Sequence, residues 1–195
     1  MSTAGLRSRL ASLPARNETP ALLCVTGASG VGKTSALAAL GEQIEPRLLP
    51  MFAFDSLGVP SADEMQLGWE TPRGWQKAMT WFWVRAAKSV YRTRPLVMLE
   101  GQFDPQYAIA AASANGVRVA IALIDVDDAT RRDRLMRRGQ PELATDEMAT
   151  WAGYLREQTA VLGGSIIDGS QDRNAVVDAI CALALPLVTD IGAAC

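Results

Sequence analysis

The feature that most constrains this chain is the segment 27–34, GASGVGKT, which matches the pattern G-x-x-x-x-G-K-[ST] at every fixed position. An apolar run, Ala21–Thr26, comes directly before it, and an Ala- and Leu-rich helical run over 33–40 follows it. A glycine-rich turn at the start of a helix gathers backbone N–H groups around one point, where they and the helix dipole hold an anion. The pattern therefore predicts an α/β fold with a phosphate-binding loop after its first strand.

Each part of this loop has an expected task. The Lys33 ammonium group adds a positive charge at the β- and γ-phosphates of a bound nucleotide, and the Thr34 hydroxyl is a ligand for Mg²⁺. The residues expected to hold ATP in the loop are Gly27, Ala28, Ser29, Gly30, Val31, Gly32, Lys33, Thr34 and Ser35. The alternative, a glycine-rich turn without a ligand, fits less well because the strand–loop–helix context agrees independently.

Short apolar runs alternate with helical patterns along the rest of the chain. The runs expected to form strands are 21–26, 48–54, 96–100, 118–124 and 165–168. We expect the first helix after the loop to close at Gly41 and the last helix to run towards Pro186. A helix begun at Thr71 places Phe82 and Trp83 on its apolar face. Strands separated by helices predict a parallel sheet with helices on both faces.

Composition limits the chemistry that the chain can perform. Its 195 residues suit one domain over 21–195 after a lead-in segment over 1–20 that we expect to hold a short helix. No histidine is present, so a Ser-His-Asp triad and a His-ligated zinc site are excluded, and proton transfer falls to Asp, Glu, Lys, Tyr or water. The three cysteines form no CxxC pair. The net charge of −2 argues against a nucleic-acid partner, and no apolar stretch reaches the ~18 residues of a membrane span, so a cytoplasmic protein is expected.

With these features the chain resembles the P-loop NTPases, and among them the small kinases of the nucleotide, shikimate, gluconate and chloramphenicol type, over residues 22–184. The resemblance implies a three-layer fold whose five-stranded parallel sheet has the order 2-3-1-4-5. It also implies an acidic residue after strand two, an arginine-bearing helix with a lid after strand four, and a loop after strand five that touches the adenine. The chain has Asp55, the arginines of 131–138 and the segment 168–170 at these places, and the lid would lie near 130–155.

Other classes of P-loop protein fit the residues less well. A GTPase needs an N/T-K-x-D motif to read its base, and neither Lys77 nor Lys88 lies in one. Motor and AAA-type ATPases favour a strand that ends in Asp-Glu, whereas the third apolar run ends in Glu100, Gly101 and Gln102. A small kinase is therefore the class that the sequence favours.

Several acidic and polar residues follow the expected strands, at the sheet edge where open α/β sheets bind ligands. Asp55 is expected to orient or deprotonate the phosphate acceptor, with a turn-shaping role as the alternative. Glu100 and Gln102 are expected to contact the substrate, or Glu100 to hold Mg²⁺ through water, with loop bracing as the alternative. Asp168 and Ser170 are expected beside the nucleotide, as the resemblance implies.

Arginines crowd one short helix near the expected lid, at positions Arg131, Arg132, Arg134, Arg137 and Arg138. Guanidinium groups neutralise the charge that spreads over a transferring phosphoryl group, and Arg134 and Arg138 are the expected catalytic pair. The alternative is a solvated basic face favoured by the helix dipole. Trp69 is expected to contact the acceptor, whereas Trp75 lies on an apolar helix stripe and is expected in the core.

Together these observations predict an enzyme that uses ATP and Mg²⁺ to phosphorylate a small hydroxylated molecule. The identity of this phosphate acceptor stays open among nucleosides, sugars, sugar acids, antibiotics and nucleotide sugars. No nucleic acid, membrane or obligate protein partner is expected. The alternatives are a P-loop NTPase or nucleotide-dependent switch, in which water is the acceptor, and a nucleotide-binding module without catalysis.

Overall fold

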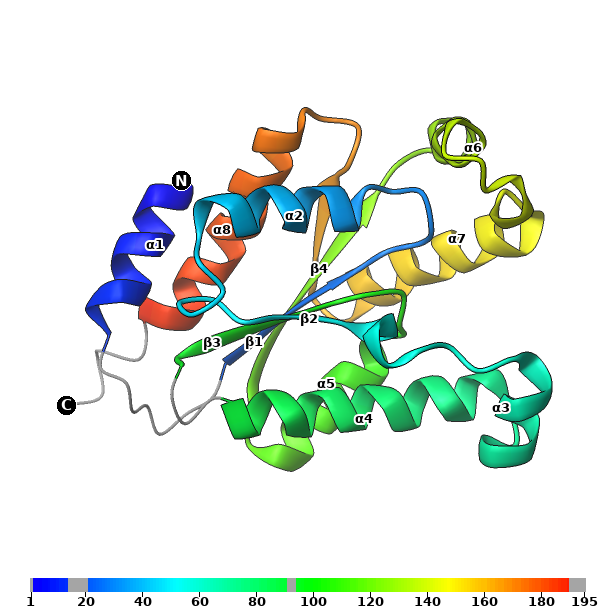
Figure 1. Cartoon of the computed structure of the whole chain (residues 1–195), viewed down its shortest axis with the longest axis horizontal. Coiled ribbons are helices and arrows are strands. Elements are labelled where there is room, and N and C mark those ends of the chain that lie inside the picture. Colours follow the sequence, from blue (N-terminus) through cyan, green and yellow to red (C-terminus); the bar gives the residue numbers. More distant parts are fainter. Residues whose placement is uncertain (1, 14–20, 91–93, 190–195) are drawn as a thin grey trace.

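The computed structural model describes residues 2–13, 21–90 and 94–189, which form a five-stranded parallel sheet flanked by helices (Figure 1). The strands are β1 Ala21–Thr26, β2 Met51–Ala53, β3 Leu96–Glu100, β4 Arg118–Asp125 and β5 Ser165–Asp168. Their order in the sheet is β2-β3-β1-β4-β5, and every adjacent pair is parallel. The expected fold class and strand order, 2-3-1-4-5, are confirmed.

Helices cover both faces of this sheet (Figure 1). One face carries α1 Thr3–Ser12, α2 Lys33–Gln43 and α8 Arg173–Thr189, and the other carries α4 Pro72–Val90 and α5 Pro105–Asn115. The remaining helices are α3 Ala62–Trp69, α6 Asp128–Arg137 and α7 Asp146–Val161, with 3₁₀ turns η1 Phe54–Leu57 and η3 Pro141–Leu143. Because strand β1 is central and covered on both faces, all six of its residues are buried, and the five that come before Thr26 are apolar.

The two faces of the sheet bury separate apolar clusters. Leu23 and Val25 of β1 point into the cluster beneath α2 and α8, whereas Leu22 and Cys24 point into the cluster beneath α4 and α5. This alternation is the period of two that a strand imposes on its side chains. Burial raises the pKa of the Cys24 thiol far above its ordinary value, so Cys24 is a small apolar core residue. The core thus fixes β1, and with it the loop that follows.

Four details differ from the sequence expectations. Strand β2 is limited to 51–53, because the backbone after Pro50 pairs with β3 only until it turns into η1 at Phe54. Helix α2 continues past Gly41 to Gln43. Helix α8 continues through Pro186 to Thr189, since a proline so close to the helix end removes only one backbone hydrogen bond. Phe82 is 48% exposed and lies off the buried stripe of α4 that contains Trp83.

The N-terminal helix α1 packs beside α8, where the Arg9 guanidinium donates a hydrogen bond to the Val188 carbonyl. The rest of the lead-in segment, 14–20, lies outside the described residues. Among the helices of the described residues, none combines the length and the apolar character that crossing a membrane requires.

Candidate active site

The phosphate loop joins β1 to α2 at the carboxyl edge of the sheet, as the sequence predicts. Two of its glycines are required by both backbone angle and space. Gly27 has φ +152°, and a Cβ atom there would lie 2.4 Å from the Ile124 carbonyl oxygen. Gly30 has φ +90°, and a Cβ atom there would lie 2.9 Å from the Arg131 carbonyl oxygen. The loop therefore packs tightly against β4 and α6, which a side chain at either position would prevent.

Lys33 begins α2 and folds back over the loop. Its Nζ donates hydrogen bonds to the carbonyl oxygens of Gly27 at 2.8 Å and Ala28 at 3.0 Å. Burial lowers the pKa of Lys33 to about 8, although the negative charges of Glu100 and Asp55 oppose this change. Lys33 is thus a cation that is held in the loop and flanked by two carboxylates.

A cavity of about 540 Å³ opens on one side of the phosphate loop, between the ends of β2 and β3 and the segment after α6. Residues from four separate parts of the chain line it: Ser29, Gly30, Gly32, Lys33, Thr34, Ser35, Asp55, Glu100, Gly101, Gln102, Arg138, Gln140 and Leu143. We call it the acceptor cavity. It brings together the predicted residues Lys33, Thr34, Asp55, Glu100 and Gln102, and it adds Gln140, which the sequence reasoning missed.

The two carboxylates of the acceptor cavity sit in an unusual electrostatic environment. Partial burial on the cavity wall raises the pKa of Asp55, and the positive charge of Lys33 opposes this change. Burial also raises the pKa of Glu100; Lys33 lowers it, and the negative charge of Asp55 raises it further. The Glu100 Oε2 atom is buried and has no hydrogen-bond partner among the described residues. A buried carboxylate oxygen without a partner is costly to fold, so Glu100 is suited to receive a ligand.

A hydrogen-bonded chain of side chains braces this cavity from behind. The Ser29 hydroxyl donates to Gln102 Oε1 at 3.0 Å, and Gln76 Nε2 donates to the Gln102 carbonyl at 3.2 Å. The other end of the Gln76 amide accepts from the Asp104 backbone N–H at 3.1 Å, and the Tyr154 hydroxyl donates to Asp104 Oδ2 at 2.7 Å. Burial and that hydrogen bond raise the pKa of Tyr154 to about 12. No pattern in the sequence marks Gln76, because only the fold brings α4 beside the end of β3.

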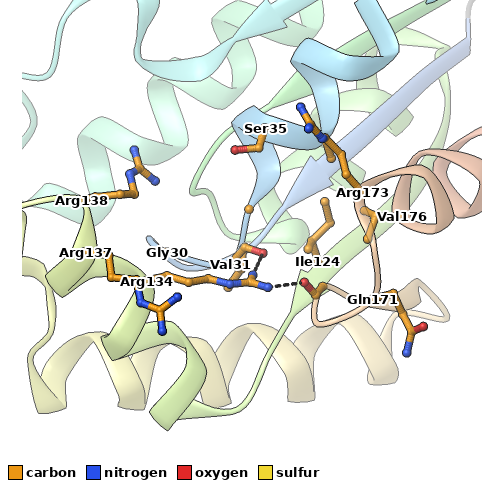
Figure 2. Close-up of a pocket in the computed structure, with 13 residues that line it drawn as sticks. Gly30, Val31, Ser35, Ile124, Arg134, Arg137, Arg138, Gln171, Arg173 and Val176 are labelled. Carbon is orange, nitrogen blue, oxygen red and sulfur yellow. Dashed lines mark hydrogen bonds between the residues drawn. The ribbon is translucent and has the colours of Figure 1, made fainter.

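A second cavity of about 570 Å³ lies on the other side of the loop (Figure 2). Its lining residues are Gly30, Val31, Gly32, Ser35, Ala36, Ile124, Arg134, Arg137, Arg138, Gly169, Gln171, Arg173 and Val176. We call it the donor cavity. Figure 2 shows the Arg173 side chain running from the start of α8 towards Ser35. The two cavities share Gly30, Gly32, Ser35 and Arg138, so they meet at the phosphate loop.

The two arginines chosen from the sequence have different surroundings. Arg134 Nη1 donates to the Val31 carbonyl at 2.9 Å and Nη2 donates to the Gly169 carbonyl at 2.8 Å (Figure 2). Arg134 therefore ties the phosphate loop to the loop after β5. The Arg138 side chain forms no hydrogen bond or ion pair with the described residues, and it lines both cavities. Of these two arginines, Arg138 is the one whose guanidinium is free to contact a ligand.

The other arginines of this cluster hold the chain after α6 in place. Arg131 is fully buried, bonds Asp128 at 2.6 Å, and also donates to the carbonyls of Leu143 and Thr145. Arg132 pairs with Asp128 and with Asp146 at the start of α7, and Arg137 pairs with Asp133. The solvated basic face considered from the sequence does not describe Arg131, because folding buries its guanidinium against backbone carbonyls.

The loop after β5 differs from the expectation in which residues face the donor cavity. Asp168 accepts hydrogen bonds from the Ser170 N–H and hydroxyl and from the Gln171 amide, which lower its pKa to about 2. Asp168 and Ser170 thus shape a turn and do not line the cavity, whereas Gly169, Gln171 and Arg173 do. The sequence pattern locates the loop, but the turn decides which of its residues face a ligand.

Neither Trp69, the expected acceptor contact, nor Trp75, the expected core residue, lines either cavity. Trp69 ends α3, is 38% exposed, and lines neither cavity, so the structure does not place it at the acceptor. The end of α3 packs against the first turn of α4, where the Trp69 carbonyl lies against Gly74. Trp75 is buried, with its ring edge-on to Phe54 at a centroid distance of 5.7 Å. Trp75 is a core residue, as expected.

No protein-family model and no curated protein matches this chain. Solved structures do. A gluconokinase from Sinorhizobium meliloti 1021 is similar over 90% of this chain and 97% of its own, with 17% identity and a TM-score of 0.54. A shikimate kinase from Acinetobacter baumannii, in complex with shikimate, is similar over 89% and 96%, with 15% identity and a TM-score of 0.53. The tunicamycin resistance protein of Deinococcus radiodurans covers 85% and 95%, with 18% identity and a TM-score of 0.58.

These similarities extend along most of each chain, and they agree with the phosphate loop and the strand order described above. The chain therefore has the fold of the P-loop small-molecule kinases. At these identities the likeness concerns the fold, and the chemistry of the site must be argued from its own residues.

Proposed function

We propose that the protein is an ATP- and Mg²⁺-dependent phosphotransferase that acts on a small hydroxylated molecule. The observation that carries this proposal is the position of the phosphate loop between two cavities of different character, with Lys33 lining one of them. The donor cavity has arginines and no acidic lining residue, which suits a nucleoside triphosphate. The acceptor cavity has the carboxylates of Asp55 and Glu100, which suit a hydroxyl group. A donor and an acceptor bound there would meet at the loop.

The residues present fit a magnesium ion that is held together with a nucleotide. Within the described residues, no three Cys, Asp or Glu side chains cluster to form a metal site of their own. Mg²⁺ commonly binds through one or two protein oxygens plus substrate phosphates, so such a cluster is not needed. Thr34 and the unpartnered carboxylate of Glu100 line the same cavity and would hold the ion, Glu100 through water. The ion would supply charge neutralisation and orientation of the phosphates.

Catalysis in this proposal is mostly positioning and electrostatic stabilisation. The acceptor oxygen bonds to the γ-phosphorus while the bond to the β–γ bridging oxygen breaks, and ADP leaves. Asp55 accepts the proton that the hydroxyl loses; the raised pKa makes its carboxylate a better base than an ordinary aspartate. Lys33 and Arg138 stabilise the charge on the phosphoryl oxygens, and Arg134 holds the loop that binds them.

We also propose that the segment 139–145 acts as the lid over the bound phosphates. It follows Arg138 and contributes Gln140 and Leu143 to the acceptor cavity wall. Arg131 and Arg132 tie this segment to α6 through backbone carbonyls, so it would move together with that helix. Closure would bring Arg138 onto the phosphates and exclude water.

The test is transfer of label from γ-labelled Mg·ATP to a panel of hydroxylated metabolites and antibiotics. We expect a labelled small molecule whose formation requires Mg²⁺ and is lost in Asp55→Asn. The Lys33→Ala variant should lose label transfer. Its matched control is Lys77→Ala at an exposed position on α4, which should retain activity. Steady release of labelled inorganic phosphate with no labelled acceptor would instead indicate an NTP hydrolase or a nucleotide-dependent switch. Nucleotide binding without any turnover would indicate a module that lacks catalysis.

A further inference from the structure

The charges around the acceptor cavity are unbalanced once a nucleotide is considered. Among its lining residues the cations are Lys33 and Arg138, and the anions are Asp55 and Glu100. A bound triphosphate would draw Arg138 and the other donor-cavity arginines together with a divalent metal ion. Three charged residues line the acceptor cavity and not the donor cavity: the cation Lys33 and the anions Asp55 and Glu100. Lys33 would also face the phosphates, so the charge left for the acceptor is that of the two carboxylates.

From this imbalance we infer that the acceptor is a hydroxylated molecule that bears an amino group and no carboxylate or phosphate. The inference rests on the function proposed above and names its substrate class. An ammonium group would pair with Glu100, whose Oε2 atom has no partner among the described residues, while the hydroxyl is presented to Asp55 and the loop. An acidic group in the same place would face two carboxylates and a polyphosphate.

The remaining wall of the cavity offers no substitute cation. Ser29, Gln102 and Gln140 are neutral polar residues, and Leu143 is apolar. Their hydroxyl and amide groups suit the hydroxyls of a polyol or sugar. Neutral groups alone would accept an uncharged acceptor; the carboxylates add the preference for a cation.

The other arginines near the phosphate loop do not line the acceptor cavity: Arg134, Arg137 and Arg173 line the donor cavity. Arg73 stacks over the Tyr154 ring at 5.5 Å from its centroid and does not line the cavity. Arg131 and Arg132 pair with Asp128 and with the carbonyls beneath the lid. Shikimate, the molecule bound in one of the similar structures, is a carboxylic acid, and this cavity has no spare cation for such a group. The inference therefore separates this chain from that neighbour by charge.

The experiment uses three sets of hydroxylated molecules matched in size: amino sugars and amino alcohols, neutral sugars and polyols, and sugar acids with sugar phosphates. Glucamine, D-glucitol and D-gluconate form one matched trio, because they differ only in the group on the first carbon. Each set is tested with the full chain for label transfer from γ-labelled Mg·ATP. Each is also tested for a thermal shift in the presence of a non-hydrolysable ATP analogue and Mg²⁺.

We expect label in the amine set, with kcat/KM at least about tenfold above the matched neutral molecule and the acids lowest. Preferred labelling of a neutral or an acidic molecule overturns the inference but leaves the phosphotransferase intact. If no set is labelled and only the amines give a thermal shift, the inferred ligand class stands and the proposed phosphotransferase activity is overturned. If no set is labelled and the shift comes from another set, or from none, both are overturned.

A charge variant of the cavity wall gives an independent readout. Gln140→Arg adds a cation to the acceptor cavity, and Gln140→Leu alters the same position without a charge. For any matched pair, the arginine variant should raise binding of the acid relative to the amine by about tenfold, and the leucine variant should not. An unchanged acid-to-amine ratio in Gln140→Arg would show that charge does not select the acceptor.

Discussion

The two cavities beside the phosphate loop are built from different kinds of groups. The donor cavity is built around the loop backbone and arginines, including the Arg134 bridge between Val31 and Gly169. The acceptor cavity is built from side chains, with Asp55 and Glu100 as its anions and amides around them. Backbone groups accept any chain of phosphates in the right geometry, whereas side chains select by shape and charge. The donor side of such a fold can therefore stay constant while the acceptor side sets specificity.

Lys33 lines the acceptor cavity between Gly32 and Ser35, which both cavities share, and its removal should have the largest effect on the proposed reaction. Lys33→Ala removes the loop cation and its hydrogen bonds to the carbonyls of Gly27 and Ala28. We expect single-turnover phosphoryl transfer to fall by about 10²–10³-fold, which is typical for loss of one group that stabilises transition-state charge. ATP binding is measured in parallel by calorimetry. Unchanged turnover in a folded Lys33→Ala protein would contradict the assignment of the donor site.

Asp55 tests the acceptor side alone. Asp55→Asn keeps the shape of the side chain and removes its basicity, so acceptor phosphorylation should fall by about a hundredfold or more. Mg·ATP affinity should change little, because the Asp55 side chain faces the acceptor cavity and does not line the donor cavity. The comparison variant is Glu100→Gln, which should instead change the Mg²⁺ concentration needed for activity. A collapse of ATP affinity in Asp55→Asn would show that Asp55, rather than Glu100, binds the metal.

Two arginines four residues apart separate a catalytic role from a positioning role. Arg138→Ala should lower kcat by about tenfold to a hundredfold and leave the free energy of unfolding within about 0.5 kcal/mol, because the Arg138 side chain has no partner among the described residues.

Arg134→Ala should lower the free energy of unfolding by about 1–3 kcal/mol, because the carbonyls of Val31 and Gly169 lose a charged donor. Urea unfolding and steady-state kinetics with varied ATP measure both variants. A larger stability loss in Arg138→Ala than in Arg134→Ala would reverse the two roles.

The parts of the molecule that could be predicted from the sequence are those encoded locally. The phosphate loop 27–34 is a contiguous motif in which glycines are required, and the β-branched residues of β4 favour a strand, so both were located correctly. Strand β2 was predicted too long because its apolar residues continue into η1, where Phe54 is buried without strand pairing. Apolar character alone does not distinguish those two states.

The parts that could not be predicted depend on which residues the fold brings together. Gln76 contacts Gln102 only because α4 lies beside the end of β3, and no local pattern reports this. The arginine cluster at 131–138 was recognised, but its pattern does not report that Arg131 is buried against the carbonyls of Leu143 and Thr145, whereas the Arg138 side chain has no partner among the described residues. The same applies to Asp168, whose turn directs Gln171 rather than itself to the cavity lining.

The smallest predicted effect is the pH dependence of ATP affinity, which depends on the charge of Lys33 beside the carboxylates of the acceptor cavity. Lys33 has its pKa lowered to about 8 by burial, with the carboxylates of Asp55 and Glu100 opposing the change. A bound triphosphate favours the charged lysine, so its pKa is higher in the complex. Below about pH 8 Lys33 is already charged in the free protein, so ATP affinity should not change with pH. Above about pH 8 Lys33 must take up a proton when ATP binds, so ATP affinity should fall by up to about tenfold per pH unit.

Calorimetry between about pH 7.5 and 9.5, in buffers of different ionisation enthalpy, measures both the affinity and the proton uptake. Lys33→Arg is the matched variant, because a guanidinium stays charged throughout this range and the step should disappear whatever the absolute affinity. The carboxylates give a second handle, since they raise the pKa of Lys33. Glu100→Gln should move the step to lower pH, because it removes the first of those negative charges. A step that stays at the same pH in Glu100→Gln would show that the charge of Glu100 does not influence Lys33.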